Sequence, residues 1–177
     1  GDSRAIMVSR SFNNNTSISQ LSTDHKPELP KEKERIIGCQ GEVFQEYKSD
    51  PYRVWCKGKD YPGIAMSRSL GDAVAKSIGV CYEPEITIRK INRDNMYIIV
   101  ASDGLWEYLS NKDILDRISG IYSKKGNASE ASEKLCTSAR DKWKMNTNKT
   151  IFFIKHKIYK FVYPKLTLIF SSSSSIS

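Results

Sequence analysis

The stretch Met96-Tyr97-Ile98-Ile99-Val100-Ala101-Ser102-Asp103-Gly104 decides the fold class. Residues 96–101 are apolar without alternation, a pattern typical of a β-strand that is buried on both faces. The apolar run stops directly at Ser102-Asp103-Gly104, a sequence that favours a turn. We therefore predict that Asp103 follows a rigid buried strand and faces a sheet edge or a cleft.

Two interpretations of Asp103 remain open from the pattern alone. Its carboxylate could bind a hard divalent cation such as Mg²⁺ or Mn²⁺, which prefers oxygen ligands. Alternatively it could cap the turn that follows. Glu107 lies four residues further on, and one helical turn would bring its side chain back toward Asp103. Asp2, in a Gly-Asp-Ser turn, and Asp72, beside Gly71, carry the same ambiguity; a helix cap or a partner for Arg68 is favoured for Asp72.

The rest of the chain predicts a mixture of helices and strands. Residues 2–10 are predicted to form a turn followed by a strand. Periodicity and stop signals place further strands at 84–91 and 96–101, and helices at 31–37, 73–78, 111–118 and 128–143. A short extended segment is expected at 39–44, and irregular loops at 11–23 and 46–62. Ser110 and Asp113 have the spacing of a capping box at the start of a helix.

The positive charge of the chain is confined to one end. The 177 residues carry a formal net charge of +8, but residues 142–177 contain seven lysines and no acidic residue. The remainder is therefore nearly neutral, and its charge does not indicate binding to nucleic acid. We assign residues 1–145 to one folded portion and 146–177 to a divergent basic tail that ends in serines. Either the tail forms a pair of strands or it does not belong to the fold, and we favour the latter.

Several classes of protein and site are excluded by what the sequence lacks. No apolar run reaches the roughly 18–20 residues that a membrane-spanning helix needs. The four cysteines are widely spaced, so four buried thiols in a reducing compartment are favoured over a zinc site or a disulfide framework. No P-loop, G-x-S-x-G, G-x-G-x-x-G or H-E-x-x-H motif occurs, and His25 and His156 are isolated. Of the kinds of catalytic site considered, this leaves a metal site with oxygen ligands.

Five blocks of sequence, in order, resemble the metal-dependent protein phosphatases of type 2C. They are Gly1-Asp2-Ser3-Arg4-Ala5, Leu21 to Pro27 with Glu32, Arg35 and Ile36, Pro62 to Asp72 with its Ser-Arg-x-x-Gly-Asp motif, Glu83 to Ile86, and Ala101 to Glu107. Their number, order and spacing make the resemblance specific. It covers residues 1–142.

The resemblance implies an α+β fold, a partial α-β-β-α sandwich. It implies hydrolysis of phosphoserine or phosphothreonine by a metal-activated water, with two or three Mn²⁺ or Mg²⁺ ions. By this resemblance Asp103 is a ligand of the main metal pair, and Asp2, Asp103 and Glu107 hold a further, weaker ion. The family usually has Asp at the position of Glu107. Residues 41–62 correspond to the flap beside the cleft, which helps to select substrates.

Several parts of the family pattern do not occur in this sequence. The D-G-H-G-G block of the amino-terminal half is absent, and Met145-Asn146-Thr147-Asn148 stands where the family places its last acidic ligand. The chain also begins without a methionine. We therefore expect it to be a carboxy-terminal portion of such a phosphatase, with the amino-terminal half of the fold missing, and to be inactive alone.

Two other functions remain as alternatives. The chain could be a pseudophosphatase or a partner-binding module without catalysis, or its basic tail could bind anionic lipid or nucleic acid. On the favoured interpretation the partner is a phosphoprotein substrate, and nucleic acid is not expected to bind. The complete protein is expected to be monomeric and intracellular, in the cytoplasm or the nucleus.

Overall fold

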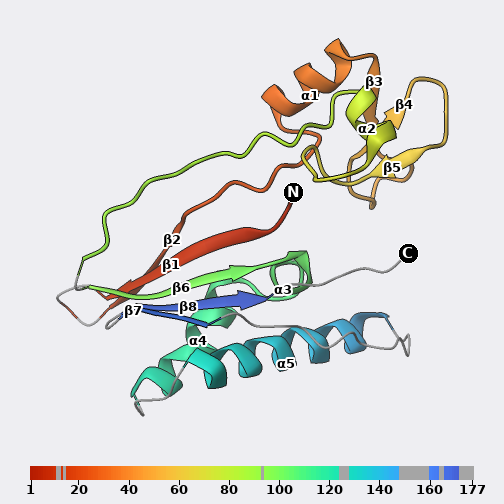
Figure 1. Cartoon of the computed structure of the whole chain (residues 1–177). Coiled ribbons are helices and arrows are strands. Elements are labelled where there is room, and N and C mark those ends of the chain that lie inside the picture. The colour runs from red at the N-terminus through yellow and green to blue at the C-terminus, as the bar shows by residue number, and fades with distance from the viewer. Residues whose placement is uncertain are drawn as a thin grey trace. The chain divides into compact units, whose positions relative to one another are not determined.

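A computed structural model describes residues 1–10, 13, 15–92, 94–123, 128–147, 160–163 and 166–171. The strands are β1 (Arg4–Arg10), β2 (Thr16–Gln20), β3 (Gly41–Phe44), β4 (Arg53–Cys56), β5 (Pro62–Ile64), β6 (Asn95–Ala101), β7 (Lys160–Tyr163) and β8 (Leu166–Ser171). The helices are α1 (Pro30–Gly38), α2 (Ala73–Ser77), α3 (Asp103–Trp106), α4 (Asn111–Ser123) and α5 (Ala128–Thr147). They form two compact units (Figure 1).

The five-stranded unit comprises Ser3–Ser22 and Thr87–Ser177. Its sheet has the strand order β2-β1-β6-β8-β7, and β1 runs antiparallel to both β2 and β6. Strand β8 is parallel to β6, and β7 is antiparallel to β8. Arg4 at the start of β1 pairs with Ala101 at the end of β6. This register determines which residues leave the sheet at the same end of the two strands.

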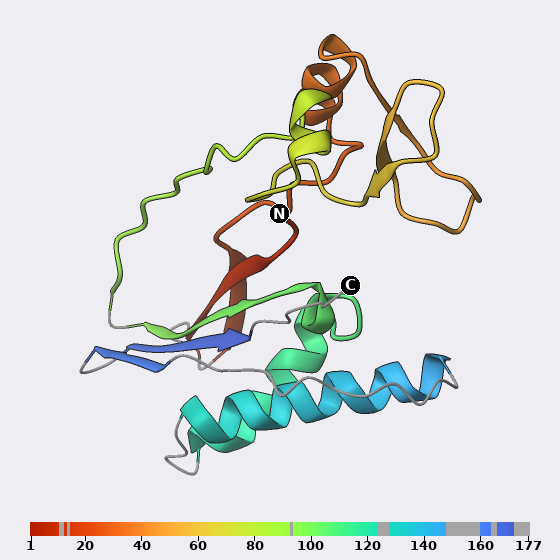
Figure 2. The ribbon, with the colours of Figure 1, turned by 45° about the vertical axis from the view of Figure 1, so that its right-hand side comes forward.

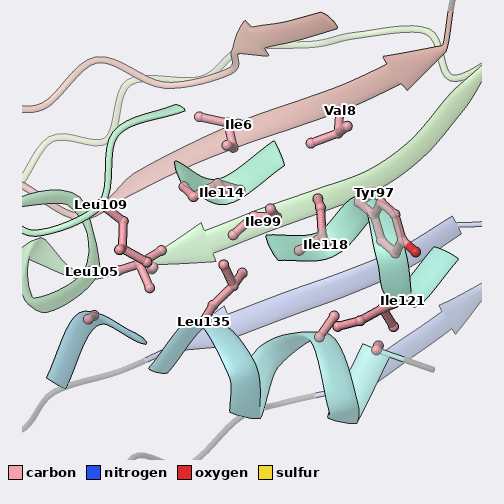
Figure 3. Close-up of a cluster of buried hydrophobic side chains, with 14 residues drawn as sticks. Ile6, Val8, Tyr97, Ile99, Leu105, Leu109, Ile114, Ile118, Ile121 and Leu135 are labelled. Atoms are coloured by element: carbon pink, nitrogen blue, oxygen red, sulfur yellow. The ribbon is translucent and has the colours of Figure 1, made fainter. Parts of the chain in front are cut away.

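Helices α4 and α5 lie along one face of this sheet (Figure 1). Alternate residues of β1 and β6 point toward them, as the pleat of a strand requires, and meet the apolar stripes of the helices. Figure 3 shows this core, which includes Ile6, Val8, Tyr97, Ile99, Leu105, Leu109, Ile114, Ile118, Ile121 and Leu135. Ile98 and Val100, the residues of β6 between them, are only half-buried. The prediction of a strand buried on both faces therefore holds here for one face.

The predicted capping box starts α4. The Asp113 N–H donates to the Ser110 hydroxyl over 3.1 Å, and the Ser110 N–H donates to the Asp113 carboxylate over 2.9 Å. Hydrogen bonds from Ser110, and then from Lys142, hold the pKa of Asp113 well below its usual range. Lys142 of α5 also forms an ion pair with Asp113 over 3.0 Å, which links the two helices.

We expect Ser110→Ala to increase amide hydrogen exchange in the first turn of α4 about fivefold, because one capping acceptor is lost. Hydrogen-exchange mass spectrometry measures this directly. Lys112→Ala is the matched control, since Lys112 is an exposed residue of the same turn. Equal exchange rates in the two variants would show that the capping box does not stabilise this helix.

The three-stranded unit comprises Gly1–Asp2 and Thr23–Ile86. Its antiparallel sheet has the order β3-β4-β5, and Figure 2 shows α1 and α2 together on one side of it. The buried core consists of Ile36, Val54, Ala75, Ile78 and Val80. A Cβ atom on Gly79, whose φ is +98°, would come within 2.7 Å of the Ile36 Cα atom. Glycine at this position therefore allows the chain after α2 to pass close to α1.

A buried carboxylate joins α1 to the loop that follows β5. Glu32 accepts hydrogen bonds from Arg35 over 2.8 Å, from the Ser67 hydroxyl over 2.6 Å, and from two nitrogens of Arg68 over 2.6 and 3.1 Å. Burial alone would raise the pKa of Glu32, but the hydrogen bonds from Arg68, Arg35 and Ser67 outweigh it and hold this pKa well below its usual range. Arg68 also donates to the Glu83 carbonyl.

Several elements differ from the sequence predictions. Strand β2 lies inside the predicted loop 11–23, and β4 lies inside the predicted loop 46–62, because pairing with β1 and β3 stabilises these short strands. Residues 84–91 do not form the predicted strand: Ile86 is 79% and Ile88 is 90% exposed, and neither pairs within the described part of the chain. Local alternation favours a strand, but a strand also needs a neighbour to bond with.

The structure contains the strand pair β7–β8, which is one of the two alternatives stated for the tail, and whether residues 146–177 belong to the fold stays a prediction. All four cysteines are free thiols, as expected, but Cys39 is exposed and the other three are half-buried rather than buried. Among the described residues, no helix is long and apolar enough to cross a membrane.

Candidate functional site

Asp103 is the first residue of α3, directly after β6. Its side chain is exposed, and the Oδ1 atom accepts the N–H of Gly104 over 2.8 Å. The Trp106 indole donates to the Ala101 carbonyl over 2.7 Å, and the Arg4 guanidinium lies 5.4 Å from the centre of a Trp106 ring. These contacts hold the turn against the ends of β1 and β6. The sequence prediction of a carboxylate on a rigid support is therefore correct.

Glu107 lies on the same face of this turn. Its N–H donates to the Asp103 carbonyl over 2.9 Å, so the two residues are one helical turn apart, as predicted. Burial raises the pKa of Tyr108, and the negative charge of Glu107, a hydrogen bond with Glu107 and the charge of Asp103 raise it further. Both carboxylates thus act on one phenol. No sequence motif marks Tyr108, so it is not among the predicted site residues.

Asp2 belongs to the three-stranded unit, and its carboxylate has a basic partner. The Lys26 ammonium donates to the Asp2 Oδ2 atom over 2.7 Å. This contact is neither of the two roles, metal ligand or cap of the turn, that the sequence left open for Asp2. Lys26 is part of the matched block 21–27, but its charge alone did not indicate which acidic residue it would meet. Asp2 belongs to the three-stranded unit, whereas Asp103 and Glu107 belong to the five-stranded unit.

The described residues do not by themselves fit a complete metal centre. Magnesium and manganese ions take several oxygen ligands, and more than one carboxylate is usual. Asp103 and Glu107 supply two carboxylates on one turn, whereas Asp2 is bonded to Lys26. Nowhere in the described ranges does a group of three His, Cys, Asp or Glu side chains have a geometry that could hold a metal ion. Further ligands would have to come from outside these residues.

Asp72 makes neither of the contacts that the sequence favoured for it, a helix cap or an ion pair with Arg68. Asp72 occupies the N-cap position of α2, but its φ is +53° and its side chain makes no capping hydrogen bond. Arg68 pairs with Glu32, not with Asp72. His25 contacts the Glu85 carboxylate over 3.2 Å. The proposed flap, 41–62, contains β3 and β4, where the Phe44 and Trp55 rings stack 5.3 Å apart.

Comparison with known proteins gives a consistent result. The family model described as "Protein phosphatase 2C" matches residues 1–147. "Probable protein phosphatase 2C 52" of Arabidopsis thaliana is 40% identical over 146 residues, which are 82% of this chain and 30% of the relative. "Probable protein phosphatase 2C 73" of the same plant is also 40% identical, over 81% of this chain and 38% of its own length. The chain thus spans about a third of these relatives.

Solved structures agree on the fold. A serine-threonine phosphatase 2C from Toxoplasma gondii matches with a TM-score of 0.71 and 22% identity, over 82% of this chain and 48% of that one. A phosphatase from a pathogenic strain of the same parasite matches with a TM-score of 0.63 and 26% identity, over 80% of this chain and 42% of that one. The fold is therefore a partial α+β fold of the type 2C kind. The chain belongs to the protein phosphatase 2C family.

Proposed function

We propose that this chain is the carboxy-terminal portion of a protein serine/threonine phosphatase. The reaction is hydrolysis of phosphoserine or phosphothreonine in a phosphoprotein, by a water that Mn²⁺ or Mg²⁺ activates. The observation that carries the proposal is the turn after β6, where Asp103 and Glu107 lie together in a chain that matches the family model over residues 1–147.

In this proposal the chain contributes only some of the ligands. Asp103 binds the main metal pair, and Asp2, Asp103 and Glu107 serve the weaker ion. By the resemblance, the family's other acidic ligands belong to the amino-terminal block that this sequence lacks and to the position where it has Met145-Asn146-Thr147-Asn148. The 177-residue chain alone is then expected to be inactive.

The test compares this chain with a chimera in which residues 1–142 replace the corresponding segment of the 40% identical Arabidopsis relative "Probable protein phosphatase 2C 52", so that the relative keeps its own residues at the position of the last acidic ligand. With millimolar Mn²⁺, the chimera should hydrolyse a phosphothreonine peptide and the chain alone should not. We expect Asp103→Ala to lower kcat/KM of the chimera by on the order of 10³-fold, because a metal ligand is lost.

Asp141→Ala is the matched control, because Asp141 is an exposed carboxylate in α5. Its activity should equal that of the unmodified chimera. An inert but folded chimera would contradict the proposal and favour the pseudophosphatase alternative. Equal activity of the Asp103→Ala and Asp141→Ala chimeras would show that Asp103 is not a ligand, and turnover by the chain alone would show that its metal site is complete.

A further inference from the structure

Exposed apolar side chains occur together around the start of α2. Leu70 is 88%, Val74 is 50% and Tyr82 is 67% exposed. Val74 follows Leu70 by four residues, and the parallel bridge between Arg68 and Cys81 brings the segments that carry Leu70 and Tyr82 side by side. Apolar side chains gathered on a surface commonly mark a place where another molecule binds.

Asp72 lies between Leu70 and Val74 in the chain. Its side chain is exposed, and within the described part of the chain its carboxylate takes part in no hydrogen bond or ion pair. The ammonium of Lys76, four residues further on, lies 5.2 Å from the centre of the Tyr82 ring. The surface thus combines apolar side chains with an unpaired negative charge. Charge complementarity favours a ligand that has both an apolar and a basic side chain.

This surface is close to one carboxylate of the candidate site. Asp2 and Leu70 belong to the same three-stranded unit. A Cβ atom on Gly1 would lie 3.5 Å from the Arg68 carbonyl oxygen, so the segment that carries Asp2 passes directly against Arg68. Leu70 is two residues further on, and an extended chain advances at most about 3.5 Å per residue. A peptide with one residue at Asp2 therefore reaches Leu70 with a residue about four positions away.

We propose that Leu70, Asp72 and Val74 form a docking surface for the residues that flank the phosphorylated residue of a substrate. An apolar side chain of the substrate packs against Leu70 and Val74, and a neighbouring basic side chain pairs with Asp72. The substrates are then phosphoproteins with an apolar and a basic residue near the phosphorylated position. This inference rests on the proposed function, which places the phosphorylated residue near Asp2.

Binding of labelled peptides to the 177-residue chain tests this surface without requiring turnover. Three peptides have a central phosphothreonine and, on both sides of it, either Leu-Arg, Leu-Glu or Ser-Arg. At low salt, the dissociation constant of the Leu-Arg peptide, measured by fluorescence anisotropy, should be about fivefold lower than that of the Leu-Glu peptide, because an attraction to Asp72 replaces a repulsion. It should also be about fivefold lower than that of the Ser-Arg peptide, because leucine buries apolar surface.

Variants of the chain assign the two contacts. Asp72→Lys should reverse the charge preference, so that the Leu-Glu peptide binds more tightly than the Leu-Arg peptide, a result that a purely structural role of Asp72 would not give. Leu70→Ser should remove the preference for Leu-Arg over Ser-Arg. The matched controls are Asp60→Lys, at another exposed carboxylate of the same unit, and Ile37→Ser, at an apolar side chain that is 54% exposed. Both should bind the peptides as the wild type does.

Two results overturn the inference. Equal binding of the three peptides to the wild type would show that no such docking surface exists. Equal shifts in Asp72→Lys and Asp60→Lys would show that the preference arises from the net charge of the chain and not from a contact at Asp72.

The chimera separates this inference from the proposed function. An active chimera, together with equal binding of the three peptides, would reject this inference alone. An inert but folded chimera, together with the preference for the Leu-Arg peptide, would reject the proposed function while leaving the docking surface and the chemistry of its ligand in place.

Discussion

Glu32→Ala should lower the free energy of unfolding of the three-stranded unit by about 3 kcal/mol, because it leaves two arginines without their shared carboxylate. Glu32 is almost completely buried and bonds to Arg35, Arg68 and the Ser67 hydroxyl. Arg35 and Arg68 are partly exposed, so water compensates some of the loss, and we expect the lower end of the range for broken buried pairs. Urea unfolding of the chain, monitored by hydrogen exchange in α1, measures the change in the free energy of unfolding.

Glu32→Gln and Glu34→Gln form the matched comparison. Both remove one charge from α1, but Glu34 is exposed. Glu32→Gln should lose part of the stability that Glu32→Ala loses, because the amide oxygen still accepts a hydrogen bond but carries no charge. Equal urea midpoints for the two glutamine variants would mean that the network around Glu32 does not stabilise this unit.

The same network makes stability depend on pH at the acidic end. The pKa of Glu32 in the folded chain lies below its usual value, so the unfolded chain takes up the proton first as pH falls. The contribution of Glu32 is therefore complete above its unfolded pKa of about 4.3 and is lost as pH decreases below that value toward the folded pKa. Glu32→Gln should flatten the pH dependence of the unfolding free energy in this range.

Ile99→Ala should destabilise the five-stranded unit by about 3 kcal/mol, within the range found for large-to-small changes in cores. Ile99 is 1% exposed and points from β6 into the cluster that α4 and α5 cover, together with Ile118 and Leu135 (Figure 3). The substitution leaves a cavity that a strand between two neighbours cannot readily close. Thermal or urea unfolding of the chain measures the loss.

Ile88→Ala is the control for this substitution, because the same side chain is 90% exposed at position 88 in the same unit. It should change the unfolding free energy by less than about 0.5 kcal/mol. A similar loss in both variants would mean that residue 88 is buried in the protein in solution, or that the sheet face at Ile99 is not packed as described.

Elements with strong local signals were predicted well. The apolar run before Asp103, the capping box of α4 and the apolar stripe of α5 all correspond to observed elements. These signals depend on neighbours within one or two turns, which the sequence contains directly. Short strands with weak patterns, such as β2 and β4, were missed because they form only when they pair with β1 and β3.

The same distinction between local signals and long-range contacts applies to the candidate site. One helical turn relates Asp103 to Glu107, so their proximity followed from spacing alone. The resemblance to the family could name Asp2 as a ligand, but it could not show that Lys26, 24 residues away, holds the Asp2 carboxylate. The family could be assigned from the order of the sequence blocks alone. The partner of each carboxylate could be found only from the residues that lie near it in the folded chain.

The sequence by itself thus determined the family, the strand that carries Asp103 and the main helices, because these depend on local periodicity and on the order of motifs. Only the tertiary structure decided which charges meet. Glu32 and Arg68 are 36 residues apart and Asp2 and Lys26 are 24 apart, and a charged residue can pair with any opposite charge that folding brings within reach. Long-range packing selects one partner among many, and local sequence has no information about that selection.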